Sequence, residues 1–407
     1  MIIPIKRRII VHSTSIVKDL YTCTIALLPI IMVYNTPAFN ISLGTVLLLL
    51  FLPYALLCIT RQFNQLNDSF VGIIVIFYVY FIARSQGDVR TILLYFAACV
   101  HLCGFIVGSV DANKIRSVIE KIAVISAICI FVQVFSHYLL GRNVSFILFS
   151  ALQRDYKLIY YEQVSSRFSL YRPTGPFLEP AMLSEYCIFS VISCLFPSDG
   201  SIKKAQAIII TTGMILTTSG IGVMLSAFVL GWYFFLKKDS LGKRIRKIFS
   251  GVFLAAVVLL ILSQFSFFNA TIARVFTNYE GYNAIVGRTW RWSQAINPMK
   301  GKLLWIGYGA TEVFPHYLTG VIDMIFRCGL VAVIIKFILL IDLIKKKDNI
   351  FVRLSCIVYL VLFFVAKITS VPYQVFFIGL MVIDVSRNKQ WIGENGSNNI
   401  YVRKVGV

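Results

Sequence analysis

The chain alternates long apolar runs with short polar segments, and the runs have the length of membrane-spanning helices. A hydrocarbon core of roughly 30 Å takes about 20 apolar residues per helix. The runs are continuous instead of alternating residue by residue, which predicts helices and not the strands of a membrane barrel. We expect about twelve spans, near residues 18–36, 41–59, 69–83, 90–110, 118–140, 181–197, 205–219, 221–236, 247–268, 317–344, 350–366 and 371–386.

The run at 205–236 decides the topology, because it is long enough for two short helices but contains no charged loop. Residues 217–222 interrupt it with threonine, serine and glycine, so we divide it in two. Loops kept in the cytoplasm retain Lys and Arg. With the N-terminus inside, twelve spans put the basic residues of six segments on the inner side and both termini in the cytoplasm. These residues lie within 6–18, 114–121, 203–204, 237–247, 345–347 and 387–404.

Composition supports an all-α, polytopic membrane protein: 58% of residues are hydrophobic, 14% are charged, and the mean hydropathy is +0.80. Topology accounts for most of the net charge of +21, so a nucleic-acid partner is an unnecessary explanation. The nine cysteines lie in or near apolar spans and none lies in the outer loops, which is typical of small core residues; a metal site at Cys99 and Cys103, one helical turn apart, is not favoured. The sequence has no phosphate loop, dinucleotide fingerprint or zinc-protease signature, so we expect no metal and no cofactor.

This topology divides the chain into helical parts and two long outward loops, both of them net positive. The parts are N-terminal helices (1–140), a first periplasmic loop (141–180), central helices (181–268), a second periplasmic loop (269–317), C-terminal helices (318–386) and a cytoplasmic tail (387–407).

The end of the first loop, residues 171–180, combines three prolines and a glycine with Arg172 and Glu179. These turn formers predict a rigid, extended turn at the membrane surface. Arginine presents a planar fork suited to phosphate, and Glu179 can accept a proton or hold a sugar hydroxyl. Alternatively, Glu179 only complements the dipole of the helix that follows.

The second loop carries Arg288 and Arg291 with Trp290 and Trp292 beside them. On a helix the two arginines would share a face and could clasp the two phosphates of a pyrophosphate. The tryptophans then fit a sugar-binding site, although an interfacial aromatic belt is the alternative.

His316 ends this loop beside the entry of the next span, and its ordinary pKa of about 6.5 suits a proton acceptor. Asp323 and Arg327 follow at helical spacing and can pair at i,i+4. Two geometries stay open: a continuous helix puts Arg327 near mid-membrane, whereas a helix along the surface up to Cys328 puts Lys336 there. His101 and His137 are interpreted as satisfied core or interface residues.

In order, these motifs resemble the O-antigen polymerase and ligase superfamily. The likeness is carried by Leu216-Thr217-Thr218-Ser219-Gly220, Gly287-Arg288 with Trp292, Gly307-Tyr308-Gly309, His316 and Arg327-Cys328-Gly329-Leu330. Residues 172–180 are similar to an Arg-Pro-x-Gly-x-Phe-x-Glu-Pro element of exopolysaccharide and O-antigen polymerases. The similarity covers about residues 165–332.

The resemblance implies a GT-C-like, metal-independent, inverting glycosyltransferase of the bacterial inner membrane. Its donor and acceptor would be undecaprenyl-pyrophosphate-linked oligosaccharides, joined into surface polysaccharide on the outer face, with membrane lipid and a chain-length regulator protein as further partners. Arg288 and Arg291, helped by Arg172, would hold the donor pyrophosphate, and His316 or Glu179 would deprotonate the acceptor hydroxyl. Trp290, Trp292, Asp323 and Arg327 would bind substrate.

Two other functions remain open on the sequence. A ligase would move finished glycan onto the lipid A core, but the element at 172–180 favours the polymerase. A flippase would suit twelve spans, although the two halves show no internal repeat and transport gives no reason for two arginine-rich outer loops.

Overall fold

The computed structural model describes residues 4–36, 41–66, 69–147, 171–197, 201–236, 284–345 and 350–395, with four single positions between 260 and 269. Apart from an isolated bridge between Asn35 and Ser42, these residues form helices, turns and loops, as the sequence predicts. The helices are α1 (Pro4–Ile31), α2 (Leu43–Arg61), η1 (Phe63–Leu66), α3 (Ser69–Ala83), α4 (Val89–Ile106), α5 (Ala112–Leu140), α7 (Pro180–Leu195), α8 (Lys204–Leu216), α9 (Gly220–Leu236), α12 (Ala284–Ile296), α13 (Lys302–Ile306), α14 (Gly320–Lys345), α15 (Ile350–Val365) and α16 (Val371–Asn395).

Eleven of the twelve expected spans coincide with a helix, and the twelfth, 247–268, lies almost wholly outside the described residues. Three helices are longer than predicted by several residues: α1 begins at Pro4 within the basic N-terminal stretch, α5 begins at Ala112, and α16 continues to Asn395. An apolar run marks where a chain can cross a membrane. Polar residues beyond that run can stay helical, since extending a helix costs much less than starting one.

The division of 205–236 into two helices is confirmed. α8 ends at Leu216 and α9 begins at Gly220, and between them Thr218 has a φ of 55°, a left-handed conformation that a continuing helix excludes. The Thr217 hydroxyl donates to the Met214 carbonyl at 2.6 Å and accepts from the Ser219 N–H at 3.3 Å, which satisfies backbone groups at the break.

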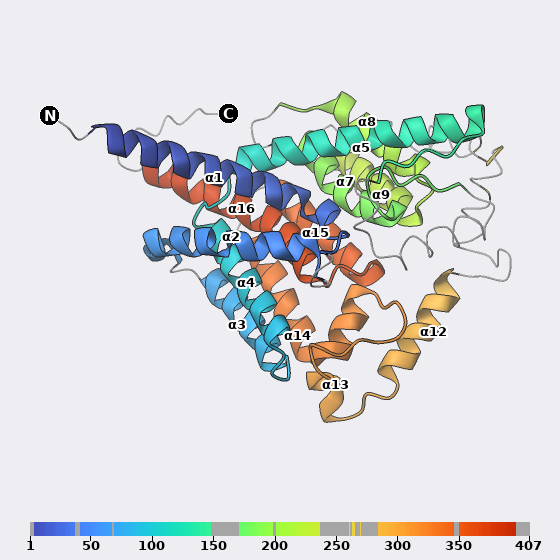
Figure 1. Ribbon diagram of the computed structural model, residues 1–407. Coiled ribbons are helices and arrows are strands. Elements are labelled where there is room, and N and C mark those ends of the chain that lie inside the picture. The colour runs from blue at the N-terminus through green and yellow to red at the C-terminus, as the bar shows by residue number, and fades with distance from the viewer. Residues whose placement is uncertain are drawn as a thin grey trace, which may run out of the picture.

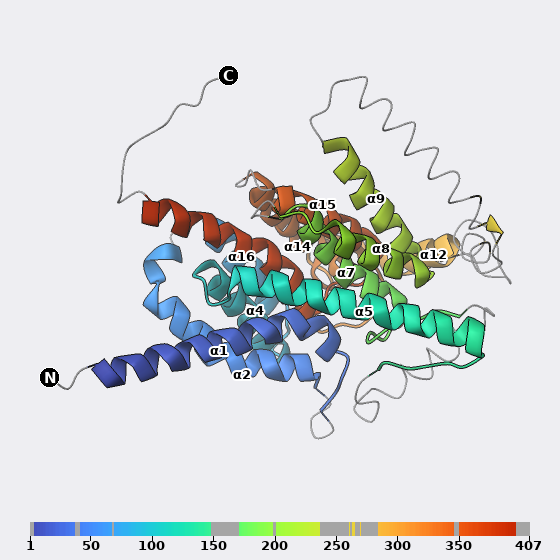
Figure 2. The same ribbon diagram turned by 90° about the horizontal axis from the view of Figure 1, so that it is seen from above.

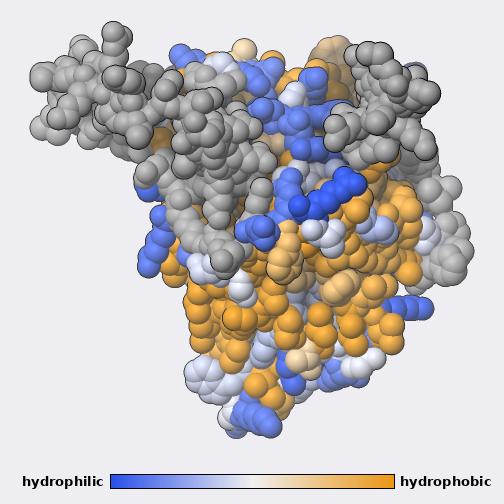
Figure 3. Space-filling view, turned by 90° about the vertical axis from the view of Figure 1, so that its left-hand side faces the viewer, coloured by the Kyte–Doolittle hydropathy of each residue, from blue (hydrophilic) through white to orange (hydrophobic). Residues whose placement is uncertain are grey.

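Four of the described helices, α2, α4, α5 and α14, are long and apolar enough to cross a membrane, and six shorter ones are apolar as well. Large apolar side chains face outward on the N-terminal helices, among them Leu50 on α2 and Ile76 and Val79 on α3. Figure 3 shows the resulting apolar belt on one face, with hydrophilic residues above and below it. A belt of this extent suits lipid and not water, which indicates a multi-pass membrane protein.

The helices form one bundle with distinct ends (Figures 1 and 2). α16 packs against α4 and α1, while α7 packs against α5, α8 and α9. In both views the start of α1 and the end of α16 lie on one side of the molecule, and α12 lies on the other. This arrangement separates the basic N-terminal helix from the arginines of α12.

α14 is broken at Gly329, where φ is 73° and ψ is −178°. The break frees backbone carbonyls, and the turn at residues 307–309 satisfies them: the N–H of Tyr308 donates to Phe326 and that of Gly309 to Arg327, both at 2.9 Å. A Cβ on Gly329 would lie 2.1 Å from the Trp305 carbonyl oxygen, so only glycine permits this approach.

The break differs from both geometries that the sequence left open. The helix starts at Gly320, so residues 320–328 form a half-helix that is neither continuous with the rest of α14 nor an extension of the loop. Lys336 lies in the second half, fully buried, with its ammonium group 5.0 Å from the Phe77 ring and 5.1 Å from the Tyr359 ring. Aromatic faces of this kind stabilise a buried cation.

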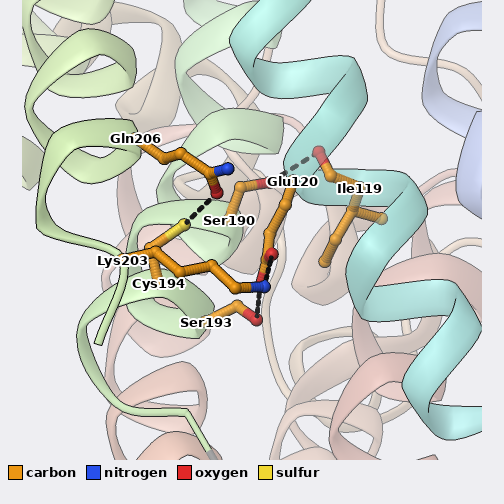
Figure 4. Close-up of polar contacts among 7 residues, drawn as sticks. All are labelled: Ile119, Glu120, Ser190, Ser193, Cys194, Lys203 and Gln206. Atoms are coloured by element: carbon orange, nitrogen blue, oxygen red, sulfur yellow. Dashed lines mark hydrogen bonds and ion pairs between the residues drawn. The ribbon is translucent and has the colours of Figure 1, made fainter. Parts of the chain in front are cut away.

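A polar clasp joins α5, α7 and α8 (Figure 4). Buried Glu120 on α5 accepts from the Ser193 hydroxyl of α7 at 2.6 Å and pairs at 2.5 Å with Lys203, which precedes α8. The clasp is near the C-terminal end of α7, roughly 20 Å from Glu179 at its N-terminal end. We interpret it as a structural tie remote from the predicted site residues.

Candidate functional site

The turn at residues 171–180 is held against the last part of α5. The side-chain oxygen of Gln133 accepts hydrogen bonds from the backbone N–H groups of Thr174 at 3.1 Å and Gly175 at 2.8 Å. Tyr171 stacks on His137 with ring centroids 3.9 Å apart. Gln133 is buried, so its two accepted bonds are shielded from water. α5 therefore positions the loop segment that carries Arg172 and Glu179.

Removing the Gln133 amide should loosen this segment without disturbing the rest of the bundle. Gln133→Leu leaves two enclosed N–H groups without an acceptor, at a cost of about 1–3 kcal/mol for each group. We expect a lower unfolding temperature in detergent and faster proteolysis between residues 171 and 180. Val132→Leu, at an exposed neighbouring position, is the matched control. Equal proteolysis of the two variants would contradict the role assigned to Gln133.

Glu179 is the N-cap residue of α7, and Pro180 follows it at the first helical position. The side chain of Glu179 is exposed and makes no capping hydrogen bond to the helix. A carboxylate here still complements the helix dipole. Because it does not bond to the first turn of α7, it remains available to a ligand. Arg172, seven residues earlier in the same turn, is half-buried.

α12 carries the arginines and tryptophans of the second loop, so the helix on which Arg288 and Arg291 would share a face is present. Arg288 is half-buried, and the Nε of Arg291 donates to the Gly287 carbonyl at 2.9 Å, which ties the base of that guanidinium to its own helix. Trp290 is 53% exposed, and its ring lies 5.8 Å from that of His316. Trp292 is half-buried. The structure thus brings His316 to α12.

Tyr317, which no motif singled out, is the residue around which these groups gather. Burial raises the pKa of its phenol, and the carboxylates of Glu185 and Glu179 raise it further; the charge of Arg288 and a hydrogen bond from the Lys367 backbone lower it. Tyr317 is nevertheless 43% exposed. Groups from three other segments of the chain, α7, α12 and the loop before α16, therefore lie within electrostatic range of one hydroxyl.

Glu185 is the functional candidate that the sequence analysis missed. It lies on α7 with 5% of its surface exposed, and it makes no hydrogen bond or ion pair with the described residues. A carboxylate within an apolar span is costly and marks function more often than structure. That signal was present in the sequence between Ser184 and Tyr186.

Asp323 and Arg327 form the predicted i,i+4 pair, with Arg327 Nε and Asp323 Oδ1 3.2 Å apart. The second oxygen of Asp323 accepts from the Thr369 hydroxyl at 2.7 Å. Asp323 is buried, whereas Arg327 lines a cavity of about 340 Å³. Lys367, Thr369 and Ser370, from the loop between α15 and α16, line the same cavity.

His101, by contrast, is confirmed as a satisfied core residue. Its Nδ1 lies 2.5 Å from the Tyr21 hydroxyl and its Nε2 lies 2.9 Å from the Leu48 carbonyl oxygen. His137 is half-buried and bonds to Asn143 besides stacking on Tyr171. The described residues include no group of three or more histidine, cysteine or carboxylate side chains arranged to hold a metal ion.

The predicted site residues thus form two neighbouring groups. Glu179 and Arg288 lie within electrostatic range of Tyr317, next to which His316 packs against Trp290, while Arg327, paired with Asp323, borders the cavity; the Lys367 loop reaches both. This arrangement places a cation and two carboxylates within electrostatic range of Tyr317, beside an imidazole. It can bind an anionic group and accept a proton from a hydroxyl. No family model, curated protein or solved structure matches this chain.

Proposed function

We propose that this protein is a membrane-embedded glycosyltransferase that joins undecaprenyl-pyrophosphate-linked oligosaccharides into O-antigen or a related surface polysaccharide. The observation that supports this most is that Glu179 and Arg288 both lie within electrostatic range of Tyr317, although 109 residues separate them in the chain. A cation for a leaving phosphate and a carboxylate for an incoming hydroxyl are the two groups that glycosyl transfer from a pyrophosphate requires.

The proposed topology has about twelve spans, with residues 141–180 and 269–317 outward and both termini in the cytoplasm of a bacterium. Agreement between eleven expected spans and observed helices supports it, as does the separation of α1 and α12. The basic clusters then lie on the inner side, where such residues are retained.

In the proposed reaction, Arg288 and Arg291, assisted by Arg172, hold the donor pyrophosphate. The acceptor hydroxyl loses its proton to a base and attacks the anomeric carbon from the opposite side, so the configuration inverts. The bond between that carbon and the phosphate oxygen breaks, and the arginines stabilise the charge left on the phosphate. Trp290 and Trp292 offer aromatic faces to sugar rings beside His316 and Tyr317.

Three groups are candidates for the base: His316, Glu179 and Glu185. Each can accept a proton, and general-base catalysis contributes typically about 10²–10⁴ in rate. Glu179 and Glu185 lie within electrostatic range of Tyr317, while His316 contacts Trp290. The exposed positions of His316 and Glu179 suit contact with a large substrate, whereas the burial of Glu185 suits a shielded proton transfer.

Glu185→Gln should separate activity from stability. The amide keeps the shape of the carboxyl but cannot accept a proton, so elongation should fall at least about 10-fold if Glu185 is the base. Because Glu185 has no hydrogen-bond or ion-pair partner among the described residues, the variant should be at least as stable as the parent. The measurement is chain elongation beside the unfolding temperature. Full elongation by this variant would leave His316 and Glu179, to be compared as alanine variants in the same assay.

The proposed function is tested directly with purified protein and lipid-linked repeat units. Longer lipid-linked glycan, resolved as a ladder on a gel, is the expected product. A flippase would give no longer glycan in detergent, and that result would overturn the proposal. A deletion strain distinguishes the ligase: a polymerase mutant still attaches single repeats to the lipid A core, whereas a ligase mutant attaches none.

A further inference from the structure

The cavity beside Arg327 has a positive electrostatic character that the proposed pyrophosphate site does not explain. It lies where three helices begin, and its lining includes Ser42 before α2, Thr91 in the first turn of α4 and Ser370 before α16. The start of a helix carries partial positive charge and unpaired N–H groups, so it favours an anion. Ser42 and Asp88 already accept from the N–H groups of Thr45 and Thr91, so the helix starts add only in part to the charges of Arg327 and Lys367.

The two cations of the cavity differ in their partners. Arg327 is paired with Asp323, so the two together carry no net charge. The ammonium group of Lys367 makes no ion pair or hydrogen bond with the described residues. The Ser370 hydroxyl is shielded from solvent and likewise has no hydrogen-bond partner among the described residues. Of these two groups, the Lys367 ammonium is the one that an anionic oxygen in the cavity would engage.

The carboxylates nearest the cavity are already engaged. Asp323 accepts from Arg327 and from the Thr369 hydroxyl. Asp88, the N-cap of α4, accepts from the backbone N–H of Thr91 at 3.0 Å and from its hydroxyl. Neither forms an ion pair with Lys367, although the Asp88 carboxylate offsets the partial positive charge at the start of α4, so Lys367 is the cation of this cavity that lacks an ion-pair partner among the described residues.

The remaining lining indicates what kind of anion would enter. Met32, Val33 and Leu94 are apolar, and they come from the end of α1 and the first turns of α4. A cavity with a cationic end and an apolar side suits a phosphoryl group attached to a hydrocarbon chain better than it suits a free inorganic ion.

We propose that this cavity is a second phosphate-binding site, which takes the phosphoryl headgroup of the lipid-linked acceptor. The inference rests on the proposed function for the identity of that lipid, because a polymerase must hold two lipid-linked substrates at once. Lys367 contacts the phosphoryl oxygens, while Arg327, fixed by Asp323 and Thr369, lies beside them. The backbone of Lys367 also hydrogen-bonds to the Tyr317 hydroxyl, so the two headgroups would lie near each other.

Binding of geranyl pyrophosphate, a short prenyl pyrophosphate, tests this without any need for elongation. Calorimetry in detergent should show two molecules bound per chain for the parent and one each for Lys367→Ala and Arg288→Ala. Loss of one charge-assisted contact should weaken the remaining binding at the cavity at least about 10-fold. Lys367→Arg, which keeps the charge, should restore two molecules, and Lys302→Ala, at an exposed cation on α13, should leave both.

The outcomes separate the two sites and the two sources of phosphate. Two molecules bound by Lys367→Ala would overturn the cavity site, whereas two bound by Arg288→Ala would count against the proposed donor site alone. Inorganic pyrophosphate and geraniol serve as the chain-free and phosphate-free probes. Binding of geranyl pyrophosphate at the Lys367-dependent site, with no binding of geraniol there, supports a phosphorylated lipid as the ligand. Inorganic pyrophosphate binding there as tightly as geranyl pyrophosphate would overturn the assignment to a lipid.

Discussion

Replacing Arg288 with alanine should abolish surface polymer while the protein stays folded in the membrane. Arg288 is half-buried on α12 and lies within electrostatic range of Tyr317, beside the carboxylates proposed to receive the acceptor. Removing one preorganised group that stabilises developing charge costs about 10²–10³ in rate. Loss on this scale would shorten a polymer ladder to single repeats. The measurement is the ladder from a deletion strain that expresses the variant.

Two further variants serve as controls for the Arg288→Ala result. Lys302→Ala removes a cation from α13, in the same outward segment but at an exposed position, and should leave the ladder unchanged. Arg288→Lys keeps the charge but loses the planar fork that fits a phosphate, so it should recover only part of the activity. A normal ladder from Arg288→Ala, with equal protein in the membrane, would remove Arg288 from the proposed mechanism.

The helices could be predicted because each membrane span is a continuous apolar run in the sequence. Each span needs about 20 apolar residues, and a chain cannot expose its backbone to lipid, so an apolar run is nearly sufficient to locate a helix. The division between α8 and α9 was predictable for a related reason. A pair of helices in the space of 32 residues needs a break, and residues 217–222 supply the polar and flexible positions for one.

The site could be predicted only in part, because its members come from distant segments. The motifs on α12 and at residues 171–180 could be recognised in the sequence because each combines arginine with tryptophan or proline in an outer loop. Tyr317 did not, since a tyrosine at the end of a loop is ordinary until Glu179, Glu185 and Arg288 are known to surround it. Lys367 was missed for the same reason. It belongs to a short loop, and only folding brings it to the cavity beside Arg327.

The break in α14 illustrates a limit of a different kind. Residues 320–345 have the composition of one continuous span, and a glycine within a membrane helix is common. Whether such a glycine bends the helix depends on what approaches it. Here the segment around Trp305 approaches Gly329, and the turn at 307–309 binds the carbonyls of Phe326 and Arg327. The glycines at 307–309 and at 329 can be identified from the sequence, but the contact between these two segments cannot.

Gly329→Ala should therefore have the largest structural effect of any glycine-to-alanine change within the described part of the chain. The glycine has a φ of 73° with ψ near 180°, a combination open almost only to glycine, at a cost of about 1–3 kcal/mol for another residue. The new Cβ would also meet the Trp305 carbonyl carbon at 2.2 Å. Overpacking of this kind adds about 1–3 kcal/mol. We expect a sharply lower unfolding temperature in detergent and loss of the polymer ladder, because Arg327 and the turn at 307–309 would shift together.

Gly301→Ala separates the two causes. Gly301 also has a positive φ, 55°, but a Cβ there would meet nothing within 4 Å. It therefore bears the backbone strain without the collision, and its unfolding temperature should fall much less than that of Gly329→Ala. Gly72→Ala, within α3 and equally open, should be neutral or slightly stabilising, since alanine favours a helix over glycine by about 1 kcal/mol. Equal losses at positions 301 and 329 would mean that strain alone decides the effect. In that case the contact between residues 305 and 329 would not be what holds the two halves of α14 at their break.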